Sequence, residues 1–209
     1  FLPFHRHLRE MPRLRCVAIA ASGFDDFDVA SATKNGVVVT NAPVQEGAEV
    51  VADMAIGLML AVCRQIPHHH ISLSRGDRSR GTGSSMFRRT LGIIGLGNIG
   101  RLVALRAKGF NMRILAVEPM PDREFVGEHN VELVSQDEIL RQADFISLHV
   151  RLNDQTRHMI SREQLSLMKP TAILINTARQ DLVDEPALVE AIQQQKVGGA
   201  GLDDPPGLA

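Results

Sequence analysis

Short runs of apolar residues alternate with amphipathic helical segments along this chain, and the alternation limits the folds that are open to it. The apolar runs, rich in Val, Ile, Leu and Ala, lie at 15–20, 37–40, 91–95, 113–117, 131–134, 144–150, 172–176 and 198–203. Strands that are apolar along their whole length are typical of parallel sheets, in which helices cover both faces. The pattern therefore predicts an α/β fold with a doubly wound parallel sheet.

The expected helices lie between these strands, at 29–36, about 48–65, 98–110, 136–142, 162–167 and 185–194. The longest carries Met54, Leu58 and Met59 at helical spacing, which predicts a well-buried helix that Pro67 ends. A stretch rich in Ser, Gly and Arg follows at 68–89, and we expect a connection with little core of its own. Prolines mark a further break after the strand at 113–117.

Composition narrows the classes of partner. Hydrophobic residues make up 44% and charged residues 22% of the chain, and the formal net charge is −1, which argues against nucleic acid or an acidic membrane surface as a partner. The apolar stretch at 50–62 is too short, and too interrupted by Asp53, to span a membrane. Cys16 and Cys63 are expected to be buried reduced thiols, which favours the cytoplasm. The histidines at 68–70 lack the spacing of metal ligands, so no metal site is predicted.

A glycine-rich turn separates one apolar run from the helix that follows it. Its glycines, Gly95, Gly97 and Gly100, have G-x-G-x-x-G spacing, which permits a tight turn, close approach of a pyrophosphate, and helix-to-strand packing. Glu118 ends the next strand, where a carboxylate can bind ribose hydroxyls and repel a 2′-phosphate. We therefore expect a dinucleotide site that prefers NAD(H) over NADP(H). Alternatively, the glycines serve packing alone and Glu118 is a solvated strand end.

Distinctive motifs extend beyond this turn. They are GFDDFDVASATKNGVVVTNAP at 23–43, ADMAIGLMLAVCRQIP at 52–67, TLGIIGLGNIGR at 90–101, DFISLHVRLNDQTRHMI at 144–160 and MKPTAILINTARQDLVDEPALVEAI at 168–192. In order and spacing these blocks resemble the D-isomer-specific 2-hydroxyacid dehydrogenases, a family that includes phosphoglycerate dehydrogenases and glyoxylate/hydroxypyruvate reductases. The resemblance implies a Rossmann NAD-binding domain at 44–209, including a connecting helix and dimerisation arm at about 48–89. It also implies that 1–43 is the remnant of a smaller, flavodoxin-like substrate domain.

The activity implied by the resemblance is NAD-dependent transfer of a hydride between nicotinamide and a small D-2-hydroxy acid or 2-oxo acid. Arg179, in the NTAR motif, matches the catalytic arginine that grips the substrate carboxylate and polarises the reacting carbonyl, a task that suits a guanidinium. Ser22 and Gly23 match a loop whose backbone amides receive the same carboxylate. A homodimer is also implied. The competing interpretations are a non-catalytic NAD(H)-binding interaction protein, similar to corepressors of this fold, and an inactive truncated fragment.

The resemblance assigns further residues to the cofactor. Asn98 and Ile99 would meet the pyrophosphate, Thr177 and Ala178 would flank the nicotinamide ribose, and Asp203 would bind the nicotinamide carboxamide. The full expected cofactor set is Ser22, Gly95, Gly97, Asn98, Ile99, Gly100, Glu118, His149, Val150, Thr156, Thr177, Ala178, Arg179 and Asp203.

Several features depart from the family's pattern. The family's proton-transferring histidine and its carboxylate match no residue here, because Leu208 falls at the carboxylate position, and the chain is expected to be incomplete at both ends. Gln180 follows Arg179 where the family usually has glycine, and a positive φ there would cost about 1 kcal/mol. Arg151 replaces a common proline. His149 taken alone is also typical of a structural histidine, and only the block around it indicates the cofactor cleft.

Overall fold

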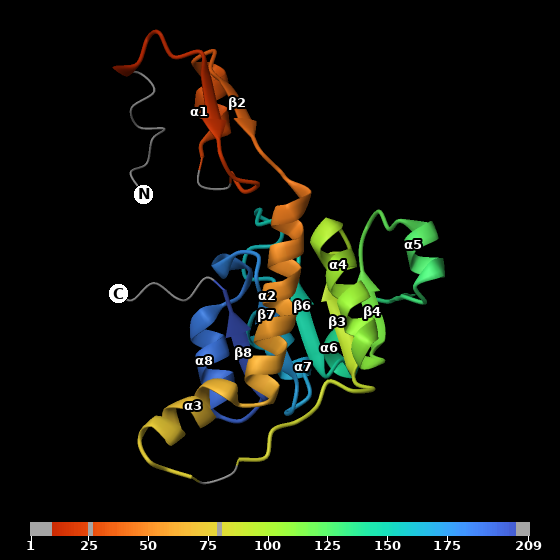
Figure 1. Ribbon diagram of the computed structural model, residues 1–209. Helices are drawn as coiled ribbons and strands as arrows, with labels where there is room; N and C mark the ends of the chain where they lie inside the picture. The colour runs from red at the N-terminus through yellow and green to blue at the C-terminus, as the bar shows by residue number, and fades with distance from the viewer. Residues whose placement is uncertain (1–9, 25–26, 79–80, 204–209) are drawn as a thin grey trace. The chain divides into compact units, whose positions relative to one another are not determined.

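The computed structural model describes residues 10–24, 27–78 and 81–203 and divides the chain into two compact units (Figure 1). One unit comprises Phe1–Ala48 and the other Glu49–Ala209, so the boundary falls within the long helix α2 (Gln45–Cys63). The domain boundary proposed from the sequence, after residue 43, lies just before this helix begins.

The smaller unit contains, in its described part, two parallel strands, one complete helix and the first residues of α2. β1 (Cys16–Ile19) pairs in parallel with β2 (Val38–Asn41). The helix α1 (Val29–Lys34) begins after Asp28, whose side chain accepts a hydrogen bond from the Ser31 N–H. Its core is small, with Ala32 and Val37 buried.

The two cysteines differ in exposure. Cys63 on α2 is buried, as the sequence indicates, but Cys16 on β1 is exposed, so the prediction of a buried thiol there is wrong. Val17 packs against the small core around Ala32, and successive side chains on a strand point to opposite faces. Cys16 therefore faces away from that core.

The larger unit is built on a six-stranded parallel sheet with the order β5-β4-β3-β6-β7-β8. Its strands are β3 (Thr90–Ile94), β4 (Arg113–Val117), β5 (Glu132–Leu133), β6 (Phe145–Leu148), β7 (Ile173–Asn176) and β8 (Gly199–Leu202). The chain enters at β3, continues outward to β5 and then returns to β6 on the other side of β3. The strand order thus reverses between β3 and β6, which is the doubly wound α/β arrangement expected from the sequence.

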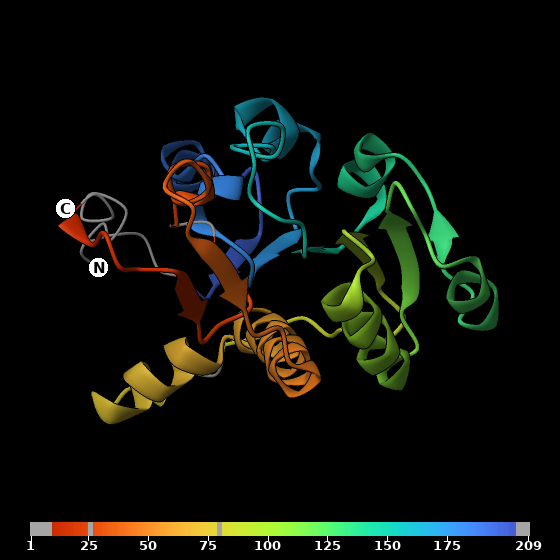
Figure 2. The same ribbon diagram turned by 90° about the horizontal axis from the view of Figure 1, so that it is seen from above.

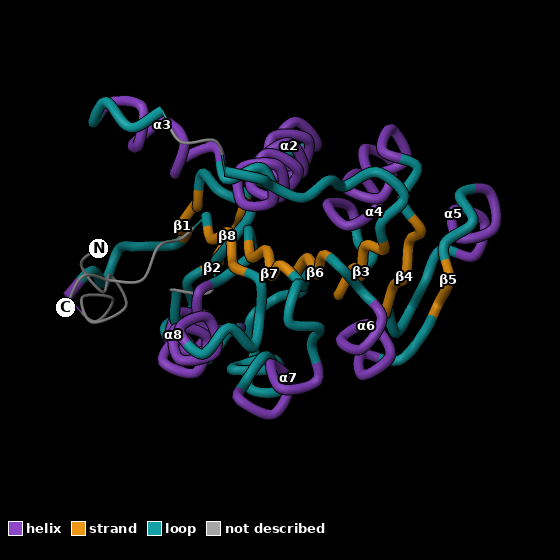
Figure 3. Tube along the Cα trace, turned by 90° about the horizontal axis from the view of Figure 1, so that it is seen from below, coloured by secondary structure: helices purple, strands orange, loops and turns teal. Residues whose placement is uncertain are grey.

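Helices cover both faces of this sheet (Figures 2 and 3). One face carries α2 and α4 (Asn98–Ala107), and the other carries α6 (Gln136–Gln142), α7 (Arg162–Leu167) and α8 (Glu185–Gln193). The buried core is divided in the same way, with Ile93 packing on the α2/α4 side and Leu174 on the α7/α8 side. All residues of β6 and β7 are buried, which explains why their sequences show no polar alternation.

Two helices of the structure differ from the sequence expectation. α3 (Ile66–Ser74) occupies part of the segment expected to be a connection, because Pro67 lies in its first turn, where the N–H that proline lacks is not needed. α5 (Arg123–Glu128) follows the proline-marked break and is capped by Asp122, whose side chain accepts a hydrogen bond from the Phe125 N–H. Two short 3-10 turns complete the unit, η2 (Lys108–Phe110) and η3 (Gln180–Leu182).

The long helix α2 is less completely buried than its apolar sequence indicates. It buries Ala52, Ala55, Met59 and Cys63, whereas Met54 is 43% exposed, so the expectation that Met54 lies in the core is wrong. No single helix in the described ranges is long and apolar enough to cross a membrane; α2 and α3 pass a length and composition test only as a pair, bent by 58°.

Candidate functional site

The candidate site lies where the strand order reverses, at the carboxyl ends of β3 and β6. Gly95 follows β3 and donates its N–H to the Val117 carbonyl at 3.0 Å. His149 follows β6 and donates its N–H to the Ile94 carbonyl at 2.8 Å. In open α/β sheets the crevice outside this reversal is the usual place for a ligand.

The three glycines of the turn between β3 and α4 have different local roles. Gly95 has φ of 96°, and a Cβ added there would lie 2.6 Å from the His149 carbonyl oxygen. A Cβ on Gly100 would lie 2.1 Å from the Gly95 oxygen. Gly97, the N-cap of α4 with φ of −74°, would place a Cβ in open space, with no atom of the described residues within 4 Å. Gly95 and Gly100 thus allow backbone segments to pack closely. Gly97 leaves open space at the N-terminus of α4, and we call this space the cradle.

This cradle suits a pyrophosphate. It lies at the first turn of α4, where backbone N–H groups, including those of Asn98 and Ile99, have no acceptor within the helix. The partial positive charge of a helix N-terminus also favours phosphate. Both expected pyrophosphate contacts therefore lie beside the open position at Gly97.

Glu118 holds the glycine turn against the end of β4. Its Oε2 accepts a hydrogen bond from the Leu96 N–H at 3.1 Å, and its Oε1 accepts one from the Met120 N–H, also at 3.1 Å. A carboxylate has about four acceptor positions, so lone pairs remain for a pair of ribose hydroxyls. The carboxylate is thus at the position that the glycine motif predicts for it.

His149 is paired with a serine on the strand that precedes it. The Ser147 Oγ lies 2.8 Å from the His149 Nε2, and Ser147 is fully buried. Burial lowers the pKa of His149 from its usual 6.5 to about 4, so the ring is neutral at neutral pH. Its neighbour Val150 also lines this turn, because a Cβ on Gly95 would lie 2.9 Å from the Val150 Cγ1.

Asn176, the last residue of β7, shapes the loop that carries the expected catalytic arginine. Its Oδ1 accepts a hydrogen bond from the Ala178 N–H at 3.0 Å, and its Nδ2 donates to the Arg179 carbonyl at 2.7 Å. The Thr177 hydroxyl inside this loop is buried and has no hydrogen-bond partner among the described residues. A buried hydroxyl without a partner is uncommon, and a bound ligand with a polar group would satisfy it.

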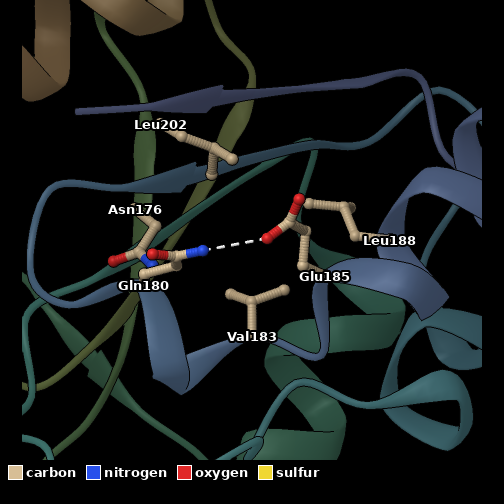
Figure 4. A pocket seen from close by; sticks show the side chains of 6 residues that line it. All are labelled: Asn176, Gln180, Val183, Glu185, Leu188 and Leu202. Atoms are coloured by element: carbon tan, nitrogen blue, oxygen red, sulfur yellow. Dashed lines mark hydrogen bonds between the residues drawn. The ribbon is translucent and has the colours of Figure 1, made fainter. Parts of the chain in front are cut away.

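Arg179 is half-buried, and its Nη1 donates to the Ala178 carbonyl at 2.8 Å. Gln180 is not among the residues with positive φ, so the strain considered for it is absent. It begins η3 instead, and its Nε2 donates to Glu185 Oε2 at 2.9 Å (Figure 4). The small pocket around this bond is lined by Asn176, Gln180, Val183, Glu185, Leu188 and Leu202.

The loop after β6 is closed by Thr156, whose hydroxyl donates to the Arg151 carbonyl at 2.7 Å. Arg157 pairs with Asp181, and the His158 N–H donates to the Asp181 carbonyl at 2.7 Å. These contacts join the loop after β6 to η3, which follows Arg179.

The structure gathers most of the expected site residues at one edge of the larger sheet. Asp203, just after β8, donates its N–H to the Asn176 carbonyl at 3.0 Å. The gathered set is Gly95, Gly97, Asn98, Ile99, Gly100, Glu118, His149, Val150, Thr156, Thr177, Ala178, Arg179 and Asp203. Ser22 and Gly23 belong to the smaller unit, where the Ser22 carbonyl accepts a hydrogen bond from Asn41 Nδ2 at 2.8 Å. Leu208 lies outside the described residues.

Two residues that organise the site were not singled out from the sequence. Ser147 and Asn176 are the buried polar residues among those described, and each lies at or near the carboxyl end of an apolar strand. A polar residue inside an otherwise apolar strand is the signal that could have identified them, because buried polar groups require partners.

A glycine cradle and a strand-end carboxylate at the reversal of a doubly wound sheet define a dinucleotide-binding domain of the Rossmann type. Residues 56–205 match the NAD-binding domain model of the D-isomer specific 2-hydroxyacid dehydrogenases. The chain therefore belongs to the D-isomer specific 2-hydroxyacid dehydrogenase family.

Similar proteins support this assignment. A D-3-phosphoglycerate dehydrogenase of Methanocaldococcus jannaschii is 44% identical over 199 residues, covering 94% of this chain and 38% of the relative. A glyoxylate reductase of Korarchaeum cryptofilum is 43% identical over 198 residues, which cover 92% of this chain and 59% of the relative. A solved structure of Aquifex aeolicus D-lactate dehydrogenase, complexed with NAD and lactic acid, has 35% sequence identity and a TM-score of 0.87. The match covers 95% of this chain and 60% of that one. The chain thus spans 38% to 59% of the length of these two curated relatives.

The glycine geometry predicts that one alanine substitution lowers stability and that another weakens NADH binding. Gly100→Ala should lower the free energy of unfolding by about 3 kcal/mol, because its Cβ meets the backbone of Gly95. Gly97→Ala should change stability by no more than about 0.5 kcal/mol, since its Cβ meets open space. The Gly97 variant should nevertheless bind NADH about tenfold more weakly, because the methyl group occupies the cradle. Chemical denaturation and fluorescence titration measure the two effects; equal affinity in Gly97→Ala and the parent would contradict the cradle.

Proposed function

We propose that this chain supplies the NAD-binding part of an oxidoreductase that transfers a hydride between nicotinamide and a small D-2-hydroxy acid or 2-oxo acid. The observation that carries the proposal is the open cradle at Gly97, on the same sheet edge as Arg179 and the unpartnered hydroxyl of Thr177. The names of the relatives, which include glyoxylate reductase and hydroxypyruvate reductase, support the substrate class.

We also propose a reducing compartment such as the cytoplasm, because both cysteines are free.

Each group of residues has a distinct role in this proposal. The glycine turn and the first turn of α4 hold the pyrophosphate, and Glu118 accepts hydrogen bonds from ribose hydroxyls. Thr177, Ala178 and Asp203 lie on the nicotinamide side, and the bound nicotinamide supplies the hydride chemistry. Arg179 holds the substrate carboxylate through paired charge-assisted hydrogen bonds and polarises the carbonyl. We assign no residue of this sequence to proton transfer.

Arg179 also bears on the choice between a dehydrogenase and a non-catalytic NAD(H)-binding protein. A protein that only senses the dinucleotide needs no guanidinium for a substrate carboxylate. The shaped loop of Asn176 to Arg179 holds such a group at the sheet edge. This arrangement favours the oxidoreductase.

We further propose that NAD(H) is preferred over NADP(H). The preference is supported by the carboxylate of Glu118, which is fixed by the N–H groups of Leu96 and Met120. A 2′-phosphate at that position would meet a negative charge.

A Glu118 variant tests the preference. The parent chain should bind NADH at least about tenfold more tightly than NADPH, and Glu118→Gln should narrow this ratio by removing the repulsion. Glu124→Gln, an exposed acid on α5, is the matched control and should leave the ratio unchanged. Fluorescence titration with each nucleotide measures the ratio. A parent that binds neither nucleotide would overturn the proposed function, and an unchanged ratio in Glu118→Gln would overturn only the role of Glu118.

A conservative substitution tests the role of Arg179. Arg179→Lys should weaken binding of oxamate, a small 2-oxo acid analogue, to the NADH complex about tenfold or more, because lysine lacks the bidentate fork. NADH binding itself should change little. The control Arg151→Lys alters an exposed arginine in the neighbouring loop and should bind oxamate as the parent does. Calorimetry measures both ligands, and equal oxamate affinity in Arg179→Lys and the parent would argue against a carboxylate-binding arginine.

We also propose a homodimer formed through α2 and α3. Supporting it are exposed apolar side chains on these two helices: Val50, Met54, Ile66, Ile71 and Leu73. An isologous contact between two copies would remove this apolar surface from water.

Light scattering after size exclusion tests the dimer. The parent chain should elute as a dimer at micromolar concentration, and Leu73→Glu should shift it toward monomer, because a buried unpaired charge is costly. Val189→Glu, on exposed apolar surface of α8, is the matched control and should remain dimeric. A monomeric parent would refute the proposal.

A further inference from the structure

One buried polar side chain of the larger unit is not explained by the fold. Asn176 is satisfied by its own loop, but Ser147 lies between Ile146 and Leu148 in the middle of the sheet and is 0% exposed. Among the described residues, the His149 ring is the hydrogen-bond partner of its hydroxyl, with 2.8 Å between Ser147 Oγ and His149 Nε2. Burying a hydroxyl in an apolar strand costs free energy unless the hydroxyl is hydrogen-bonded, so the contact with His149 offsets that cost.

The contact determines which nitrogen of His149 carries the proton. Burial lowers the pKa of His149 to about 4, so the ring is neutral and has one N–H. If Nε2 were the donor, the hydroxyl hydrogen of Ser147 would be buried without an acceptor. If Ser147 donates to Nε2, that hydrogen is satisfied and the ring proton is on Nδ1. The second arrangement is favoured, because it pairs the buried hydroxyl hydrogen, and His149 Nδ1 is not among the buried unpartnered side-chain atoms of the described residues.

The ring also lies on the face of the sheet that carries the glycine cradle. Phe145 packs in the core on the α2/α4 side, and Ser147 and His149 follow it at the two-residue period of a strand. The helix α4 on this face is the one whose first turn contains the open position at Gly97. The backbone of His149 is in contact range of the turn, as the 2.6 Å approach of a Cβ on Gly95 to its carbonyl shows.

We propose that Ser147 is a positioning residue: it holds His149 as the Nδ1–H tautomer, so that the crevice presents a fixed hydrogen-bond donor to an oxygen of the bound dinucleotide. Among the residues that the structure describes, no hydrogen-bond partner occupies Nδ1, and the N–H is free for a ligand. The identity of that ligand rests on the proposed function; the tautomer does not.

Nitrogen NMR of the free protein tests the tautomer directly. In the chain labelled with ¹⁵N-histidine, the His149 signals are assigned by their loss in His149→Gln. We expect the chemical shift of a protonated nitrogen at Nδ1 and of an unprotonated nitrogen at Nε2. Ser147→Ala should abolish this preference, and Ser147→Thr, which keeps the hydroxyl, should preserve it. A protonated Nε2 in the parent, or an unchanged Nδ1–H form in Ser147→Ala, would overturn the proposal.

Titration with NADH tests the consequence for the ligand. Ser147→Ala should bind NADH about tenfold more weakly, because His149 is no longer oriented to donate a hydrogen bond to the dinucleotide. Ser147→Thr keeps the hydroxyl and should bind NADH within about twofold of the parent. The matched control is Ser166→Ala, an exposed serine on α7, which should bind as the parent does. Circular dichroism and thermal unfolding verify that each variant is folded.

The two experiments separate the two proposals. A parent that binds no NADH would overturn the proposed function, while the spectra of the free protein would still decide the tautomer. Normal NADH binding by Ser147→Ala, together with the expected tautomer in the parent, would overturn the link between that tautomer and the dinucleotide.

Discussion

The close packing of the turn between β3 and α4 is the constraint on which the rest of the larger unit depends. The Gly95 carbonyl lies so near Gly100 that no side chain fits between them, and Gly95 itself lies against the His149 backbone. This packing sets the direction of α4 and places its N-terminus over the crevice between β3 and β6. Glu118 then bonds the Leu96 N–H, which fixes the turn to β4 as well. One tight turn thus positions helix dipole, open cradle and carboxylate together.

Groups that stabilise the fold lie at the amino edge of the larger sheet, and groups that are open to a ligand lie at its carboxyl edge. At the amino edge, Asp144 accepts hydrogen bonds from the Thr90 N–H and from Lys169, both at 2.9 Å. Desolvation raises the pKa of Asp144, but these hydrogen bonds and the charges of Lys169 and Arg89 together outweigh it and hold the pKa below its ordinary 3.8. A carboxyl with a lowered folded-state pKa stabilises the fold at neutral pH, and that contribution is lost as the pH falls through the folded value. At the carboxyl edge, by contrast, the Thr177 hydroxyl has no hydrogen-bond partner within the described ranges, and a Cβ on Gly97 would meet no described atom within 4 Å.

The sequence predicts the strands of the larger sheet because most of their residues are apolar, and β5 (Glu132–Leu133) carries the weakest such signal. The glycine motif predicts a tight turn, but the sequence leaves open which glycines serve packing and which leaves space for a ligand. The sequence does not predict α3, because a proline that ends one helix can also lie in the first turn of the next, as Pro67 does. The exposure of Cys16 follows from which strand face meets α1, and composition carries no such information. The roles of Ser147 and Asn176 depend on hydrogen-bond geometry in the folded chain, so their sequence positions alone could only raise the question.

The segment that follows Arg179 is held to the loop after β6 by backbone hydrogen bonds more than by its exposed ion pair. The exposed pair of Arg157 and Asp181 contributes little free energy, because solvent screens it. The Ile160 N–H donates to the Leu182 carbonyl at 3.1 Å, and the Asp184 N–H donates to the Ile160 carbonyl at 2.9 Å. These bonds form a short parallel bridge between the loop that contains Thr156 and the segment after Arg179. Because both partners of that bridge are backbone, the two loops keep one mutual arrangement whatever side chains occupy their exposed positions.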